Sequence, residues 1–274
     1  GVPVRVGIVD YLNSRPLAWA FRKGADSGAF APFHLPPAEV AARLEDGSLD
    51  IGLIPSIEVQ RIPGLRVLPG LCIAATHEVR SVLLVSKVPP GRIRRLALDE
   101  NSRTSVALAK IVLHRSYGVE PECVSQPPEI EEMMQRADAA LVIGDPALRV
   151  SPGDYLVLDL AAEWRQMSGL PFVFAVWAVR SGIAADGLVP FFQNSLQMGL
   201  ENLDELIAEA GEQLGLGSQE LHEYLTVNLS FELGDEELAG LQEFYSLASE
   251  MDLIPTARPL SFLGACPSES DSVE

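Results

Sequence analysis

The chain has 274 residues, of which 47% are hydrophobic, so it is long enough for one large or two small folded domains. It carries 38 acidic against 20 basic residues, and the net charge of −18 argues against nucleic acid or an anionic membrane as a partner. No apolar run reaches the roughly 18–20 residues that a membrane span requires. An anionic ligand would therefore have to be held by local donors against an unfavourable overall field.

The cysteines give no sign of a disulfide framework or a zinc site. Cys72, Cys123 and Cys266 are widely spaced and form no C-x-x-C pair. The N-terminus enters a strand directly, without a basic segment followed by an apolar run, so no signal peptide is expected. These features predict a cytoplasmic protein with reduced thiols and no bound metal.

The first junction between a strand and a helix carries a group of polar residues. Residues 4–9 are short and β-branched, which predicts a buried strand. Asn13 or Ser14 can cap a helix that has Pro16 in its first turn and continues to Phe21. The free N–H groups of that helix would form an anion site, to which Arg15 would add a guanidinium group.

The same order of elements continues to about residue 86. A helix is expected from residues 36–39 to residues 46–47, followed by a buried strand at 50–54 and another helix that opens at Ser56. Ligands of open α/β sheets bind at the carboxyl ends of the strands, so these junctions should face one cleft. Further apolar strands are predicted at residues 66–74 and 81–86.

A proline pair and a glycine in residues 86–91 predict a crossing into a second α/β unit. An apolar run at 171–179 would return the chain to the first unit. The elements expected between them are strands at 95–98, 122–125, 139–143 and 155–158, and helices at 102–117, 130–136 and 161–167.

From Leu188 onward the apolar spacing predicts helices only, and residues 267–274 read as a disordered tail. The expected division is lobe 1 from residues 1–87 and 177–266, and lobe 2 from residues 88–176. Two α/β lobes joined by two crossings, with C-terminal helices, form the layout of a type II periplasmic-binding-protein-like fold. The oligomeric state is not predicted.

Residues 11–17, with the sequence YLNSRPL, resemble the signature of the chorismate dehydratase family, whose members serve menaquinone biosynthesis through futalosine. The resemblance extends over roughly residues 4–180 and implies the fold just described. The further matching segments, in the family's order, are residues 50–56, 80–84, 102–105, 143–145 and 169–174.

The resemblance implies a reaction that converts chorismate to 3-[(1-carboxyvinyl)oxy]benzoate and water, with no cofactor. Asn13 and Ser81 match family positions implicated in catalysis. Asn13 would donate to a carboxylate or to the leaving hydroxyl, and Ser81 would donate to that hydroxyl or relay a proton. Without the resemblance, Asn13 would be interpreted as a helix cap or turn residue and Ser81 as an ordinary residue at a strand start.

Other polar residues are expected to bind substrate. The hydroxyls at residues 102–105 begin a helix, where one would cap and another would hold a carboxylate. Arg15 would bind substrate or pair with an acidic neighbour, and Asp145 would cap a short helix or orient the site. The residues expected to bind substrate are Ser14, Arg15, Ser56, Ser102, Thr104, Ser105 and Asp145.

Two other functions remain open. One is the 1,4-dihydroxy-6-naphthoate synthase of the same pathway, and the other is a non-catalytic protein that binds a small anionic solute. The chain has no G-x-S-x-G elbow, and its four histidines lie outside the shared motifs, so an ordinary general base is not evident. This favours a mechanism in which the enolpyruvyl carboxylate of the substrate takes the proton.

Overall fold

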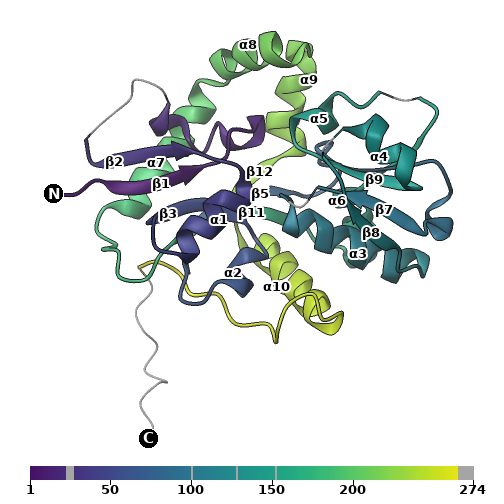
Figure 1. The fold of residues 1–274 in the computed structure, drawn as a ribbon. Helices are drawn as coiled ribbons and strands as arrows, with labels where there is room; N and C mark the ends of the chain where they lie inside the picture. Colours follow the sequence, from purple (N-terminus) through teal and green to yellow (C-terminus); the bar gives the residue numbers. More distant parts are fainter. Residues whose placement is uncertain (23–27, 100, 128, 152, 265–274) are drawn as a thin grey trace, which may run out of the picture.

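A computed structural model describes residues 1–22, 28–99, 101–127, 129–151 and 153–264. Within these residues the strands form a seven-stranded sheet and a five-stranded sheet, which lie side by side with helices around them (Figure 1). No helix in the described part of the chain is long and apolar enough to cross a membrane.

The larger sheet has the strand order β12-β5-β11-β3-β1-β2, with β4 also paired to β11. β1 is parallel to β2 and β3, whereas β11 is antiparallel to β3 and β5. Its strands are β1 (Val4–Ile8), β2 (Phe30–His34), β3 (Ile51–Pro55), β4 (Arg66–Val67), β5 (Gly70–Ala75), β11 (Phe172–Val179) and β12 (Ser230–Leu233).

The smaller sheet repeats this arrangement with the order β10-β6-β9-β7-β8. β7 is parallel to β8 and β9, and β6 is the antiparallel strand between β9 and β10. Its strands are β6 (Val82–Ser86), β7 (Arg95–Leu98), β8 (Glu122–Ser125), β9 (Ala139–Ile143) and β10 (Leu156–Asp159).

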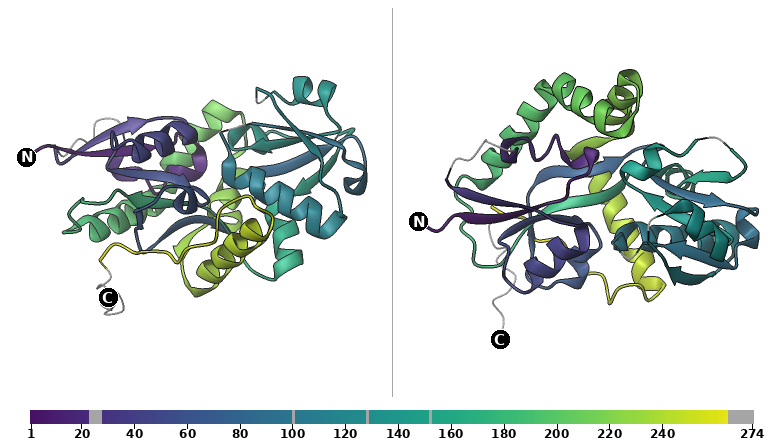
Figure 2. Two further views of the ribbon diagram at one scale, coloured as in Figure 1. Left: turned by 60° about the horizontal axis from the view of Figure 1, so that its bottom comes forward. Right: turned by 45° about the horizontal axis from the view of Figure 1, so that its top comes forward.

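The helices lie on both faces of the larger sheet and around the smaller one (Figure 2). α10 packs on β11 and also contacts α3, so it links the larger sheet to a helix of the smaller one. The helices are α1 (Pro37–Glu45), α2 (Glu58–Arg61), α3 (Arg103–Tyr117), α4 (Ile130–Arg136), α5 (Asp145–Leu148), α6 (Leu160–Ser168), α7 (Leu188–Glu201), α8 (Leu203–Leu214), α9 (Ser218–Glu223) and α10 (Asp235–Glu250).

α1 lies directly on β1 and β3 because both strands have a glycine beneath it. A Cβ atom at Gly7 would lie 2.6 Å from Leu49 and 2.9 Å from Val40, and one at Gly52 would lie 2.6 Å from Val40. Such contacts are shorter than carbon atoms tolerate, so only glycine permits this helix position. The close packing holds β1 and β3 side by side, and the residues that follow them therefore emerge together.

One predicted feature of the chain path is wrong. β6 lies in the smaller sheet, so the chain changes sheets between β5 and β6 and not at residues 86–91. The predicted return through residues 171–179 agrees with β11, which lies wholly in the larger sheet. The proline pair at 89–90 instead begins a short 3-10 turn, because β6 first completes its pairing with β9 through Ser86. The division into two lobes at residues 87 and 176 therefore stays a prediction, and sheet membership favours earlier boundaries.

The predicted helix from Pro16 to Phe21 is absent. The chain forms two 3-10 turns, η1 (Leu12–Ser14) and η2 (Trp19–Phe21), joined by hydrogen-bonded turns. Leu12, Leu17 and Phe21 are all buried, so this segment has no solvent face of the kind an amphipathic helix needs. Its amides bond within the fold, and the expected anion site at a helix start does not form.

The C-terminal region was predicted to contain helices only, but it also contains a strand. β12 pairs antiparallel with β5 at the edge of the larger sheet, and a π-helical turn, η4 (Tyr224–Asn228), precedes it. The helices expected from Leu188 onward begin with α7 and α8, which Asn202 separates. The predicted tail at 267–274 and residue Cys266 lie outside the described residues.

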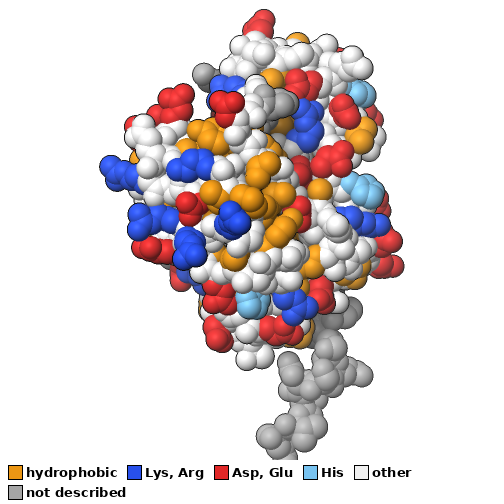
Figure 3. Space-filling view, turned by 90° about the vertical axis from the view of Figure 1, so that its right-hand side faces the viewer, with side chains coloured by type: hydrophobic (Ala, Val, Ile, Leu, Met, Phe, Trp, Pro, Cys, Tyr) orange, Lys and Arg blue, Asp and Glu red, His pale blue; other side chains and the backbone are white. Residues whose placement is uncertain are grey.

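The two sheets differ in how well their faces are covered. A small core cluster that includes Met133, Met134 and Val142 lies between α4 and the smaller sheet. Figure 3 shows hydrophobic side chains gathered on the outer face of this part of the molecule. Tyr155 and Leu156, at the edge strand β10, are 40% and 50% exposed. The main core extends from the larger sheet to α3 and α6 on the other face of the smaller sheet.

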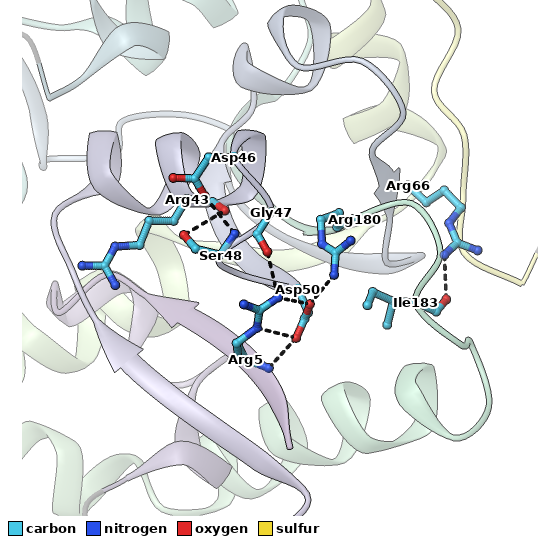
Figure 4. A network of polar contacts seen from close by, with 9 residues as sticks. All are labelled: Arg5, Arg43, Asp46, Gly47, Ser48, Asp50, Arg66, Arg180 and Ile183. Carbon is cyan, nitrogen blue, oxygen red and sulfur yellow. Dashed lines mark hydrogen bonds and ion pairs between the residues drawn. The ribbon is translucent and has the colours of Figure 1, made fainter. Parts of the chain in front are cut away.

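A charged network fixes the amino-terminal edge of the larger sheet (Figure 4). Asp50, only 6% exposed, accepts hydrogen bonds from Arg5 Nη2 at 2.8 Å and Arg180 Nη2 at 2.7 Å. The amide and Nε of Arg5 donate to the other carboxylate oxygen. These hydrogen bonds, with that of the Arg5 side chain the largest, hold the pKa of Asp50 well below its usual range.

We expect Asp50→Asn to lower the free energy of unfolding by about 2–4 kcal/mol at pH 7, because two guanidinium groups lose their shared carboxylate. The folded-state pKa of Asp50 is depressed, so its contribution is present above the unfolded pKa of about 3.9 and is lost as the pH falls. Urea unfolding should therefore give a constant gap between wild type and variant down to about pH 5 and a narrowing gap below it.

Asp46→Asn is the matched control for this change. Asp46 is exposed in the same network and accepts from the Ser48 amide at 2.8 Å, which an asparagine oxygen can also do. Its replacement should cost much less stability. Equal losses in the two variants, or an Asp50→Asn gap that stays constant from pH 7 to pH 3, would contradict the assigned role of Asp50.

Candidate functional site

A cavity of about 90 Å³ lies between the two sheets, where the carboxyl ends of several strands meet. Residues that follow β1, β7 and β9 line it, together with Ser81 immediately before β6 and Phe174 near the start of β11. Among the described residues, none that line this cavity has a charged side chain. The polar side chains that line it carry hydroxyls and amides, which suit a ligand rich in oxygen acceptors.

Six of the nine predicted site residues line this cavity. They come from both sheets, as expected for junctions at the carboxyl ends of strands. Three others do not line it: Arg15, Ser56 and Asp145. The six that do are Asn13, Ser14, Ser81, Ser102, Thr104 and Ser105.

Asn13 lies in the 3-10 turn η1 directly after β1. Its Oδ1 accepts a hydrogen bond from the Ser14 hydroxyl at 3.1 Å, which orients the amide. Ser14 is 2% exposed, so the pair is fixed by the surrounding core. The turn thus presents the Asn13 amide at the cavity without the α-helix that the sequence predicted.

Ser81 is held by the unusual backbone before it. Arg80 has a φ of +67°, a left-handed conformation that is uncommon for a residue with a side chain. Asp159 stabilises it by accepting from the amides of Val79 at 3.1 Å and Arg80 at 2.7 Å. Burial raises the pKa of Asp159, although its hydrogen bonds from backbone amides oppose that rise.

Asp159 also connects this segment to α6. Its Oδ1 accepts from the amides of Ala161 and Ala162, so the carboxylate caps the start of that helix. The backbone just before Ser81 and the first turn of α6 therefore donate to the same carboxylate. This arrangement fixes the position of Ser81 relative to the smaller sheet.

Sequence reasoning missed Tyr224, which lies behind Ser81. Its hydroxyl donates to Ser81 Oγ at 2.7 Å, and both residues are 1% exposed. Burial raises the pKa of Tyr224, and its hydrogen bond with Ser81 opposes the rise only in part. The residue lies 143 positions from Ser81 in the C-terminal region, where the apolar pattern gave no sign of a site.

The start of α3 provides the hydroxyl-rich wall of the cavity. Ser102 precedes the helix, and its side chain makes no capping hydrogen bond. Thr104 Oγ1 accepts from the Ile57 amide at 3.1 Å and so joins α3 to the chain after β3. Ser105 is 4% exposed and also lines the cavity. The helix is 15 residues long, so its first-turn amides and dipole favour an anion at this end.

Ser56 is engaged in holding β3 to β11. Its hydroxyl donates to the Val173 carbonyl at 2.8 Å, and its carbonyl accepts from the Tyr245 hydroxyl at 2.6 Å. The following helix α2 has only four residues. Substrate binding by Ser56 stays a prediction, and its described contacts are those of a structural residue.

Arg15 points away from the cavity between the sheets. Its Nη2 donates to Gln213 Oε1 in α8 at 2.6 Å, and its Nε lies 3.9 Å from Asp10. Both Arg15 and Asp10 line a different, larger cavity of about 740 Å³ beside α8. Asp10 therefore adds no negative charge to the lining of the cavity that holds Asn13 and Ser81.

Asp145 joins the two sheets instead of lining the cavity. Its Oδ1 accepts from the Leu12 amide at 3.1 Å, a contact between the end of β9 and the turn after β1. Burial raises the pKa of Asp145, while the Leu12 hydrogen bond and the charge of Arg15 lower it. The side chain thus holds η1 in place. Asp145 is the first residue of α5 and Gly144 occupies the cap position, so the contact differs from the predicted helix cap, and a role in orienting the site stays a prediction.

No metal or histidine chemistry is evident in the described part of the chain. There, no group of three or more His, Cys, Asp or Glu side chains could hold a metal ion. Cys72 and Cys123 are free, and burial raises the pKa of each thiol. His114 instead lies 3.0 Å from Glu120 on the outside of α3.

Comparison with known proteins gives both a family and a fold. A family model described as menaquinone biosynthesis matches residues 4–250. A protein of Thermus thermophilus named chorismate dehydratase is 30% identical over 261 aligned residues, which cover 88% of this chain and 94% of that protein.

Solved structures resemble the whole chain at low sequence identity. A protein of Archaeoglobus fulgidus has a TM-score of 0.75 at 18% identity and covers 93% of this chain and 99% of its own. The periplasmic aliphatic sulphonate binding protein of Escherichia coli has a TM-score of 0.61 at 17% identity, with 97% and 96% covered. These likenesses confirm the predicted periplasmic-binding-protein-like fold.

Gly144 lies where the two sheets approach each other closely beside the cavity. It has φ +67° and ψ −148°, and a Cβ atom there would lie 3.1–3.3 Å from the Tyr11 ring. We expect Gly144→Ala to lower the free energy of unfolding by about 2–3 kcal/mol, because the backbone conformation is nearly exclusive to glycine and the ring must move. Urea unfolding measures the loss.

Gly118→Ala is the control for backbone strain alone. Gly118 ends α3 at φ +68° and ψ 25°, and nothing lies within 4 Å of a Cβ atom placed there. Its replacement should cost about 1 kcal/mol. If Gly118→Ala were as costly as Gly144→Ala, the contact between Tyr11 and Gly144 would not constrain the cavity.

Proposed function

The chain belongs to the menaquinone biosynthesis family, and we propose that it is a chorismate dehydratase, like its relative from Thermus thermophilus. Its products would be 3-[(1-carboxyvinyl)oxy]benzoate and water, which makes the enzyme a carbon–oxygen hydro-lyase. One observation carries the proposal: Asn13, which follows β1 of the larger sheet, and Ser81, which precedes β6 of the smaller one, line the same cavity, whose described lining has no charged side chain. We also propose a cytoplasmic location, where a biosynthetic enzyme would meet this substrate.

The reaction sets a short list of demands on the protein. Chorismate has two carboxylates, a ring hydroxyl and an enolpyruvyl ether, and elimination removes a ring hydrogen and the neighbouring hydroxyl. Formation of the aromatic ring supplies the driving force. The site must therefore hold both carboxylates, orient the leaving hydroxyl and stabilise charge that spreads into the ring carboxylate.

Although the protein is acidic, hydrogen-bond donors without charge would bind the dianionic substrate. Ser102 and Ser105 line the cavity at the start of α3, where the helix dipole favours negative charge. Such donors have no charge of their own, and the helix fixes their positions. In a site that excludes water, preoriented donors stabilise an anion more strongly than they do in solvent.

Asn13 and Ser81 are proposed to act on the reacting atoms. The Asn13 amide is oriented by Ser14 and can donate to a carboxylate or to the leaving hydroxyl. The Ser81 hydroxyl, held by the backbone fixed at Asp159, can donate to that same hydroxyl as its bond to carbon breaks. Hydrogen bonds that strengthen as charge develops lower the barrier to elimination.

The enolpyruvyl carboxylate of the substrate is the proposed base. No acidic or histidine side chain in the described residues lines the cavity, so the closest carboxylate to the ring hydrogen belongs to the substrate. That carboxylate would take the ring proton, the C–O bond to the ring hydroxyl would break with a hydrogen bond donated to the departing oxygen, and the abstracted proton would then pass to that oxygen, so that water leaves and the carboxylate is regenerated. A chorismate analogue without this carboxylate should bind, as measured by calorimetry, yet show no elimination, and its normal turnover would exclude the mechanism.

The direct test is turnover of chorismate by the purified protein, followed by loss of the diene absorbance and by the mass of the product. We expect loss of one water from the substrate. Asn13→Ala and Ser81→Ala should each lower kcat by about 10²–10³-fold, the range found when one preoriented donor is removed from an active site. Circular dichroism would verify that the variants remain folded.

Ser86→Ala is the matched control for Ser81→Ala. Ser86 is 1% exposed at the other end of β6, where its hydroxyl donates to the Val88 carbonyl at 2.6 Å. Its replacement should change stability and leave kcat nearly unaltered. Intact chorismate with a folded wild-type protein would contradict the proposal. It would favour the 1,4-dihydroxy-6-naphthoate synthase of the same pathway, or an anion-binding protein without catalysis.

A further inference from the structure

The phenol of Tyr224 lies outside the cavity and reaches it only through Ser81. Tyr224 is 1% exposed and its hydroxyl donates to Ser81 Oγ at 2.7 Å. Ser81 lines the cavity between the sheets, whereas Tyr224 does not. Any effect of this phenol on a bound molecule must therefore pass through the Ser81 hydroxyl.

With Tyr224 as the donor, its hydrogen bond leaves the Ser81 proton available to the cavity. A serine hydroxyl has one proton to donate and two lone pairs that accept. In the described residues, the Ser81 side chain takes part in hydrogen bonding as the acceptor from Tyr224. Its own proton is then free for an acceptor in the cavity. The carbonyl of Ser81 separately accepts from the Gly144 amide at 2.8 Å, which fixes the backbone.

The backbone around Tyr224 is built to hold it there. Tyr224 begins the π-helical turn η4, a local distortion often found at functional sites. At the other end of the turn, Asn228 Nδ2 donates to the Glu78 carbonyl at 3.3 Å. Arg80 pairs with Glu220 in α9, the helix before the turn. The turn is therefore fastened on both sides to the segment that precedes Ser81.

We propose that Tyr224 is a positioning residue, whose hydroxyl holds the Ser81 side chain in one rotamer and directs its proton towards the bound substrate. The proposal rests on the proposed dehydratase function for its kinetic consequence. The phenol transfers no proton. It removes the rotational freedom of Ser81 before substrate arrives, which lowers the cost of aligning the donor in the transition state.

Tyr224→Phe removes the hydroxyl and keeps the ring. We expect kcat for chorismate to fall about 10-fold with little change in KM, because the donor is misaligned while the binding groups stay in place. In a Ser81→Ala background the same change should have no further effect on kcat, since Tyr224 acts through that hydroxyl. A purely structural tyrosine would lower kcat by the same factor in both backgrounds, which would overturn the proposal.

Tyr245→Phe is the matched control. Tyr245 is 2% exposed and donates to a backbone carbonyl, that of Ser56, at 2.6 Å. It loses the same buried hydroxyl at a site outside the cavity lining, so stability should fall as in Tyr224→Phe and kcat should not. Equal losses of kcat in the two variants would show that any buried phenol matters, and would overturn the specific role of Tyr224.

High-resolution crystal structures of wild type and Tyr224→Phe give a readout that does not depend on turnover. We expect one Ser81 rotamer in the wild type and at least two, or a different one, in the variant. An unchanged single rotamer in Tyr224→Phe would overturn the positioning role even if kcat fell. If the wild type did not convert chorismate, the proposed function would fail, and the rotamers would still decide the role of Tyr224.

Discussion

The amide of Leu12 donates to Asp145 at 3.1 Å, and this contact joins the two sheets at the edge where their functional residues emerge. Beside it, Gly144 permits the close approach of the Tyr11 ring. Without these contacts, the turn that carries Asn13 would have no fixed position relative to the smaller sheet. The hydrogen bond between Tyr224 and Ser81 and that between Ile57 and Thr104 span the same boundary. The site is therefore a product of the junction and not of either sheet alone.

The chemistry of the cavity follows from the absence of charge in its described lining. The protein has a net charge of −18, yet a dianionic substrate is proposed to bind it. Two acidic residues beside the site make structural contacts: Asp145 accepts from the Leu12 amide, and Asp159 accepts from the Arg80 amide. Each carboxylate is satisfied by backbone N–H groups, so its field at the cavity is reduced. What remains is a set of oriented neutral donors, which is the requirement for stabilising charge that spreads during elimination.

Local sequence patterns predicted the regular elements well. The bounds of β7, β8, β9 and α4 agree with prediction, because each is a short apolar run or an amphipathic helix bounded by turn residues. Prediction failed where distant contacts decide the structure. The segment through Pro16 resembles a helix start, but burial on all sides breaks it into 3-10 turns. Tyr224 could not be found because its partner lies 143 residues away. The residues that line the cavity were predicted mainly through the family resemblance, and local spacing alone would have assigned them to caps and turns.

The most direct test of the account is a crystal structure of the Ser81→Ala protein with chorismate bound. We expect the ring to lie between Asn13 and position 81, with one carboxylate at the start of α3 and no direct contact with Arg15. Chorismate in the larger cavity beside α8, or bound with both carboxylates away from α3, would contradict it. That result would show that the reaction does not take place at the junction of the two sheets.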